Sequence, residues 1–323
     1  MADSDRSLAR RPASAVVVTA VAAVAVVVVA LAAMASSTVW PLFSYSVSLA
    51  CFGLLHVVVE LRYVQARFAT RLPNALWASC GAALAAIVCV RLLRLTGVVG
   101  ALAGPLELAL VAVLLAVGAA FASRIGAVVG VAVACVVGVG AFVAPVETLL
   151  VLAVLHNFTP LGFVIERAAP DKRVVTAVVA SVVFVGAPLL VATGVPLSLA
   201  APLVDLTRSF PSTPSLFETY PVYLWPSLVQ HERALALFSA AVCAQLLHYV
   251  AVIVWLPATS TPTDRARLSL SWMAFAVVLL IVVGLVAHFA VDFVGARAVY
   301  SLVAAVHAWL ELPVLLVALS RRT

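Results

Sequence analysis

Long apolar stretches without charge constrain this fold more than any other feature of the sequence. Residues 125–146, for example, contain no Asp, Glu, Lys or Arg, and about 20 apolar residues suffice for a helix to cross a bilayer. Over the whole chain 65% of residues are hydrophobic and 10% are charged, against about 45–50% and about 25% in soluble proteins. These values exclude a soluble domain and a disordered chain. A transmembrane barrel is also disfavoured, because its strands would alternate apolar and polar residues, whereas this chain has long unbroken apolar runs. We therefore predict an all-α, polytopic integral membrane bundle, with residues 1–323 forming a single membrane domain.

The apolar runs, divided at charges, prolines and glycines, predict ten membrane spans. They cover residues 14–35, 40–60, 74–95, 97–121, 126–145, 147–166, 174–196, 233–256, 269–291 and 297–320. Residues 1–13 then form a short N-terminal tail. Arg10 and Arg11 before the first span and Ala33-Met34-Ala35 near its end also fit a cleaved signal peptide. We favour an uncleaved span, because the apolar core is long for a signal peptide.

The longest predicted connection is the loop 197–232, which is rich in proline and aromatic residues. Loops of this length usually have a function of their own or are disordered. We expect this loop to lie at the outer membrane interface, either as an anchor or as a lid over a lateral opening.

The positive charges are divided unequally between the two ends of the predicted spans. Five of the 19 Lys and Arg residues fall on the side of the long loop, and the other fourteen fall on the side of both termini; the five are Arg91, Arg94, Arg208, Arg233 and Arg297. The positive-inside rule thus predicts cytoplasmic N- and C-termini in the cell membrane. Topology explains the net charge of +6, and nothing indicates a nucleic-acid partner, since no basic run is interleaved with aromatics.

Histidines inside the predicted spans are the main candidates for function, because ionisable groups are costly in a bilayer core. Three spans carry a histidine four residues before a carboxylate, a spacing that places both on one helix face. Such a pair can be a metal ligand with its orienting carboxylate, two metal ligands, or a simple surface hydrogen bond. The pairs are His56 with Glu60, His288 with Asp292, and His307 with Glu311. Another buried acid, Glu107, suits either a supporting role at such a site or a protonated form bonded to a neighbouring helix.

Four of these histidines are predicted to lie in one layer of the membrane. His56, His156, His248 and His307 belong to four spans that run in the same direction, and a rise of about 1.5 Å per residue places them between the middle and the inner half of the bilayer. His288 lies near the outer end of its span, and His231 lies in the loop. Four imidazoles with nearby carboxylates suit a transition metal such as iron. Ring nitrogens about 3–5 Å apart would fit such a site, and separations beyond about 8 Å would exclude it.

A polytopic chain with lone histidines on separate helices resembles the Brp/Blh family of integral-membrane β-carotene 15,15'-dioxygenases, which produce retinal. The matching residues are His56 in Leu55-His56-Val57, His156 in His-Asn, His248 in His-Tyr and His307 in His-Ala-Trp. The resemblance implies Fe²⁺ held by these four histidines, oxygen as co-substrate, and a carotenoid or other isoprenoid lipid entering from the bilayer. It also implies that Glu60 and Glu311 orient ligand imidazoles, and that Phe158, Tyr249 and Trp309 line a substrate tunnel.

Two other functions remain open at this stage. A transporter or proton-coupled permease could use the histidine–acid pairs as a relay, because histidine titrates near neutral pH. It would need broken helices at the site and a water path across both leaflets. A membrane scaffold would leave the histidines apart. The five cysteines all lie in apolar spans without a CxxC pair, so they predict neither disulfides nor a thiolate metal site.

Overall fold

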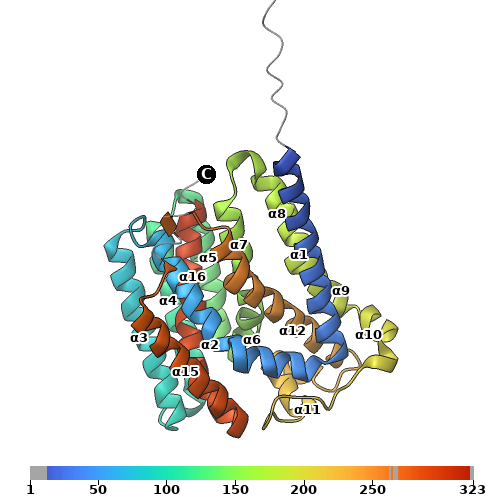
Figure 1. The fold of residues 1–323 in the computed structure, drawn as a ribbon. Coiled ribbons are helices and arrows are strands. Elements are labelled where there is room, and N and C mark those ends of the chain that lie inside the picture. The colour runs from blue at the N-terminus through green and yellow to red at the C-terminus, as the bar shows by residue number, and fades with distance from the viewer. Residues whose placement is uncertain (1–12, 262, 265–267, 321–323) are drawn as a thin grey trace, which may run out of the picture.

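A computed structural model describes residues 13–261, 263–264 and 268–320, with side chains described from Val24 onward. This part of the chain consists of helices and loops without any strand, in agreement with the predicted all-α class (Figure 1). Nine helical segments within it are long and apolar enough to cross a membrane, and they correspond to the second through tenth predicted spans. They are Pro41–Phe68, Asn74–Leu95, Gly100–Phe121, Arg124–Val143, Pro145–Arg167, Pro170–Ala192, Ala234–Ala258, Trp272–Val291 and Phe293–Ser320.

The first predicted span forms helix α1 (Ala13–Val39). Its described side chains, Val24–Val39, make up a shorter apolar helix. Figure 1 shows that α1 begins at the same end of the bundle at which the last helix, α16 (Phe293–Ser320), finishes. An even number of crossings is consistent with that arrangement. The expected cytoplasmic tail, residues 1–13, lies outside the described residues except for Ala13.

Two helices differ in length from the predicted spans for identifiable reasons. Helix α2 (Pro41–Phe68) continues eight residues beyond the predicted end at residue 60. The added turns carry Arg67, which is buried in ion pairs with Glu166 (3.1 Å) and Asp264 (3.5 Å). Helix α16 begins four residues before the predicted span, after Asp292. The end of α2 is thus set by the buried ion pairs of Arg67, and the start of α16 follows the corner at Asp292. Hydropathy alone predicted neither boundary.

Three spans are interrupted where a continuous helix was expected. The span predicted at 147–166 divides into α6 (Pro145–His156) and α7 (Thr159–Arg167), with Pro160 in the first turn of α7. Between α8 (Arg173–Ser181) and α9 (Ala187–Ala192), the π-helical turn η3 (Val182–Gly186) precedes Pro188. Similarly, η7 (Ala251–Trp255) between α12 (Ala234–Val250) and α13 (Leu256–Ala258) precedes Pro257. Proline lacks an amide donor and clashes with the carbonyl four residues earlier, and a π-turn relieves that clash within the helix.

Helix α16 lies against α2, α3 (Asn74–Leu95), α4 (Ala103–Phe121), α5 (Arg124–Val143) and α7. Glycines permit its close approach to α4 and α5. A Cβ at Gly118 would lie 2.8 Å from Cβ of Pro313, and one at Gly130 would lie 2.5 Å from Leu316.

By contrast, α15 (Trp272–Val291) presents nearly all of its apolar surface outward. Such a surface suits a lipid environment.

The segment 197–232 is built of short helical turns and packs partly into the bundle. Its turns include α11 (Leu216–Thr219) and η5 (Tyr220–Val222). Tyr220 and Leu224 are buried with Tyr45 of α2 and Phe238 of α12 in one apolar cluster. Ser212 joins the segment to the α15–α16 corner, since its hydroxyl donates to the Phe289 carbonyl (2.7 Å). The segment thus covers one end of the space between α2, α12 and α16.

Candidate metal centre

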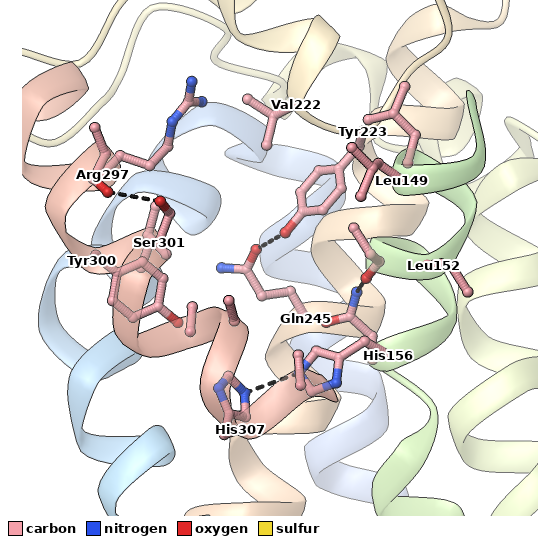
Figure 2. Close-up of a pocket in the computed structure, with 18 of the residues that line it drawn as sticks. Leu149, Leu152, His156, Val222, Tyr223, Gln245, Arg297, Tyr300, Ser301 and His307 are labelled. Carbon is pink, nitrogen blue, oxygen red and sulfur yellow. Dashed lines mark hydrogen bonds between the residues drawn. The ribbon is translucent and has the colours of Figure 1, made fainter. Parts of the chain in front are cut away.

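The four histidines predicted to share a layer converge on one point inside the bundle. They come from α2 (His56), α6 (His156), α12 (His248) and α16 (His307). The Nε2 atom of His307 lies 3.1 Å from Nε2 of His56 and 3.0 Å from Nε2 of His156. Figure 2 shows the contact between His156 and His307 at the floor of a cavity. The ring of His248 completes the group, with its centroid 4.8 Å from that of His156.

Burial and local hydrogen bonds orient these rings. His56, His248 and His307 are each at most 2% exposed, and His156 is half-buried against the cavity. Nδ1 of His56 lies 3.3 Å from the Phe52 carbonyl one turn earlier. A proton on Nδ1 makes that bond and leaves the Nε2 lone pair directed toward His307. Tyr249, next to His248, stacks on the His56 ring at 4.2 Å between centroids.

The carboxylates make ion-pair contacts with histidines on other helices, which corrects the expectation that each orients the histidine one turn earlier on its own helix. Glu60 follows His56 on α2, but its Oε2 lies 3.5 Å from Nε2 of His248. Glu311 follows His307 on α16, but its Oε2 lies 3.1 Å from Nδ1 of His156. The third predicted pair is separate from the group, because His288 is exposed and Asp292 accepts from the Gly295 amide at the start of α16 (2.9 Å).

Several polar atoms of this group are buried without an aligned hydrogen-bond partner among the described residues. They include both ring nitrogens of His248 and all four carboxylate oxygens of Glu60 and Glu311. No ion pair in the described part of the chain joins either carboxylate to an arginine or lysine. Unsatisfied buried polar atoms are costly and rare in folded proteins. A cation at this point would satisfy the nitrogens and balance the two carboxylates.

The donor atoms are close enough to hold such a cation. Each histidine offers one nitrogen, and these atoms lie within 4.8 Å of one another; Glu60, His307 and Glu311 form a second, overlapping group. Ligand nitrogens about 2.0–2.1 Å from a metal lie roughly 2.9–3.4 Å apart at ordinary coordination angles. The Nε2 separations of His307 from His156 and His56, 3.0 and 3.1 Å, fall within that interval.

A cavity of about 700 Å³ adjoins the histidines. Of the three residues that the resemblance implies for substrate binding, Tyr249 and Trp309 line this cavity, whereas Phe158 does not. Phe158 instead lines a second, apolar cavity of about 470 Å³ on the other side of α6. The helix ends at His156, and after the turn at 157–158 the Phe158 side chain lines the second cavity and not the one beside the four histidines. Leu150 and Tyr223 contribute to both cavities.

Two further groups at the cavity were not identified as site residues from the sequence. Glu107 accepts from Arg91 (2.6 Å) and from the Trp309 indole (2.9 Å). Glu107 is thus bonded to a neighbouring helix through Trp309 of α16, as one of the two sequence interpretations expected, and it also pairs with Arg91 of α3. In the other group, Tyr223 donates to the Gln245 side chain, which donates in turn to Ser48 (2.7 Å). Gln245 lies one turn before His248, and that spacing was the available signal.

Comparisons with profiles of known protein families, with curated protein sequences and with solved structures found no significant match.

Proposed function

We propose that this chain is a membrane-embedded, metal-dependent oxidoreductase that acts on a lipophilic substrate. The observation that carries the proposal is that Nε2 of His307 lies 3.1 Å from Nε2 of His56 and 3.0 Å from Nε2 of His156. A neutral imidazole nitrogen carries either one proton or one lone pair, so Nε2 of His307 cannot donate to both of its neighbours. A cation that accepts the lone pairs of all these nitrogens resolves the conflict.

The donor set suits iron. Imidazole with carboxylate is a typical combination for non-haem iron, although zinc, copper and nickel also bind imidazole. Iron(II) held by His56, His156, His248 and His307 would supply the electrons that activation of molecular oxygen requires. Glu60 and Glu311 would orient the rings of His248 and His156 and balance the metal charge. Burial of three of the four rings would keep bulk water from the site.

The substrate would come from the lipid phase. The cavity beside the histidines is large enough for a drug-sized molecule by the usual scale of about 300–1,000 Å³, and its walls include Leu149, Leu152 and Trp309. A carotenoid or other isoprenoid chain is the substrate class that the Brp/Blh resemblance implies. Tyr249 and Trp309 would position such a chain against the metal site.

One observation favours a second candidate, a proton-coupled permease. The break between α6 and α7 directly follows His156, and broken helices at ion sites are typical of transporters. The space further along these helices is closed, however. Tyr63 and Phe163 are each at most 1% exposed and pack together, with ring centroids 5.5 Å apart. A transport path through the histidines would have to open this contact.

Metal content tests the proposal. We expect full-length protein purified in detergent to contain about one transition-metal ion per chain, and the His156→Ala/His248→Ala variant to contain almost none. His288→Ala is the matched control, because this histidine is also in a membrane span but is exposed and lies outside the group. Wild-type protein without iron or another transition metal, together with unchanged thermal stability of the double variant, would overturn the proposal.

Function is tested by two further measurements on the same preparations. Iron-loaded wild-type protein should consume oxygen when a carotenoid or shorter isoprenoid is supplied in micelles, and the double variant should not. Proteoliposomes separate the two candidates. Proton flux that depends on His156 and is independent of bound metal would favour the permease.

A further inference from the structure

The cavity that ends at the histidines has a positive charge near its other end. Arg297, in the second turn of α16, lines this cavity and is half-buried. Its guanidinium is directed inward, since Nη1 donates to the hydroxyl of Tyr45 (3.4 Å), a residue that is 1% exposed. No carboxylate of the described chain lies within ion-pair distance of Arg297. The guanidinium therefore faces the cavity without a counter-charge.

Two other arginines that face the interior are neutralised by carboxylates. Arg91, which lines the same cavity, pairs with Glu107 at 2.6 Å. Arg67 pairs with Glu166 and Asp264. A partly desolvated cation without a counter-charge is unfavourable, and an anion from outside the chain would supply that charge at Arg297. Arg94 also lines this cavity and is exposed, which adds a second positive charge to its walls.

The distance from Arg297 to the histidines sets the size of the ligand. Arg297 and His307 lie on one helix, ten residues apart, which corresponds to about 15 Å along the axis. Figure 2 shows the two residues on the same helix on opposite sides of the cavity. An extended chain of about twelve carbons spans that distance. Leu149, Leu152 and Ala304 supply apolar wall between the two ends.

We propose that the cavity binds an amphipathic substrate whose acidic head group contacts Arg297 and whose apolar chain extends to the histidines. A guanidinium presents parallel donors that match a carboxylate or a phosphate group. The inference rests on the proposed function only in placing the reaction at the histidine end; recognition of the head group stands on the cavity and its charges.

Binding of three probes of equal chain length tests this proposal. Dodecanoic acid, dodecyl phosphate and methyl dodecanoate are titrated calorimetrically into the full-length protein in detergent. We expect at least one of the two acids to bind about 10–100-fold more tightly than the uncharged ester, the range for a charge-assisted hydrogen bond. The tighter of the two acids identifies the head group. Arg297→Gln should abolish that preference, whereas Arg233→Gln, an exposed cation outside the cavity, should retain it.

The outcomes separate this proposal from the proposed function. Metal-bound protein that binds acid and ester equally would overturn the acidic head group and leave the oxidoreductase proposal intact. Preference for an acid in protein that binds no metal would support the head-group site while the proposed function fails. If Arg297→Gln does not fold, the wild-type protein still tests the proposal, because a wild type that binds acid and ester equally contradicts it. The Arg94→Gln variant then shows how much of any preference for the acid comes from the second cation.

Discussion

Glu311 lies one turn beyond His307 on α16, yet its carboxylate approaches Nδ1 of His156 on α6, at 3.1 Å. The contact joins two helices that are distant in sequence at the point where α6 ends. It also means that each end of the His156 ring faces a different group, with Nε2 directed at His307. A carboxylate behind a ligand imidazole raises its basicity and holds its orientation.

We expect Glu311→Gln to weaken metal binding by about 10–100-fold, the usual effect of losing such a carboxylate. The amide retains the size of the side chain, so the bundle should remain folded. Competition with a chelator of known affinity measures the change. Glu147→Gln is the control, because Glu147 lies in the first turn of α6 and is exposed. Equal affinity in Glu311→Gln and wild type would show that the carboxylate does not support the metal.

The Arg91–Glu107 pair should contribute to stability through its burial. Glu107 is 3% exposed and Arg91 is 21% exposed at the side chain. We expect Glu107→Leu to lower the free energy of unfolding by about 3–5 kcal/mol, because it leaves a partly buried cation without its partner. The double variant Arg91→Met/Glu107→Leu should recover most of that loss. Unfolding in mixed micelles measures all three variants, and a double variant no more stable than Glu107→Leu would contradict the explanation.

Close packing of α4 on α16 makes a further prediction. A Cβ on Gly118 would lie 2.9 Å from the backbone Cα of Pro313, so Gly118→Ala should destabilise the protein by about 1–3 kcal/mol through overpacking. Gly138→Ala is a matched control on α5, since nothing lies within 4 Å of its added Cβ. That substitution should be neutral or stabilise by up to about 1 kcal/mol, the difference in helix propensity. Equal melting temperatures of the two variants would count against this contact.

The segment 197–232 should respond to acid. A hydrogen bond from the Thr207 hydroxyl, aided by amides, holds the pKa of Asp205 below its ordinary value, and the Ser215 hydroxyl does the same for the pKa of Glu218. Both carboxylates thus stabilise the folded segment above their unfolded pKa of about 4, and that contribution is lost as the pH falls through their lowered values. Carbon-13 NMR titration of the carboxyl groups measures both midpoints.

Thr207→Val should raise the Asp205 midpoint toward its value in a short peptide and leave Glu218 unchanged. Glu218 is an internal control because its contacts are with Ser215. Midpoints that already equal the peptide values in wild-type protein would exclude these hydrogen bonds in solution.

Much of the candidate site was predictable because depth along a helix depends on counting residues. His56, His156, His248 and His307 were expected in one layer, and their ring nitrogens lie within 4.8 Å of one another. The partners of Glu60 and Glu311 were not predictable. A spacing of four shows that two side chains share a helix face, but which helix meets that face depends on helix rotation and neighbours. Phe158 was misplaced for a related reason, since the break after His156 turns its side chain into the second cavity.

The sequence alone determined that the chain is a bundle of apolar helices long enough to cross a membrane, because the free energy of removing apolar side chains from water depends mainly on composition and on the length of each apolar run. It also determined which few polar residues lie within those helices. Only the tertiary structure decided that Glu60 faces His248, that Glu311 faces His156 and that Arg297 faces the cavity opposite His307. These relationships depend on how the helices rotate and how closely they approach one another. Contacts between helices, such as that of Gly118 on α4 with Pro313 on α16, set both, and the sequence of one helix does not show them.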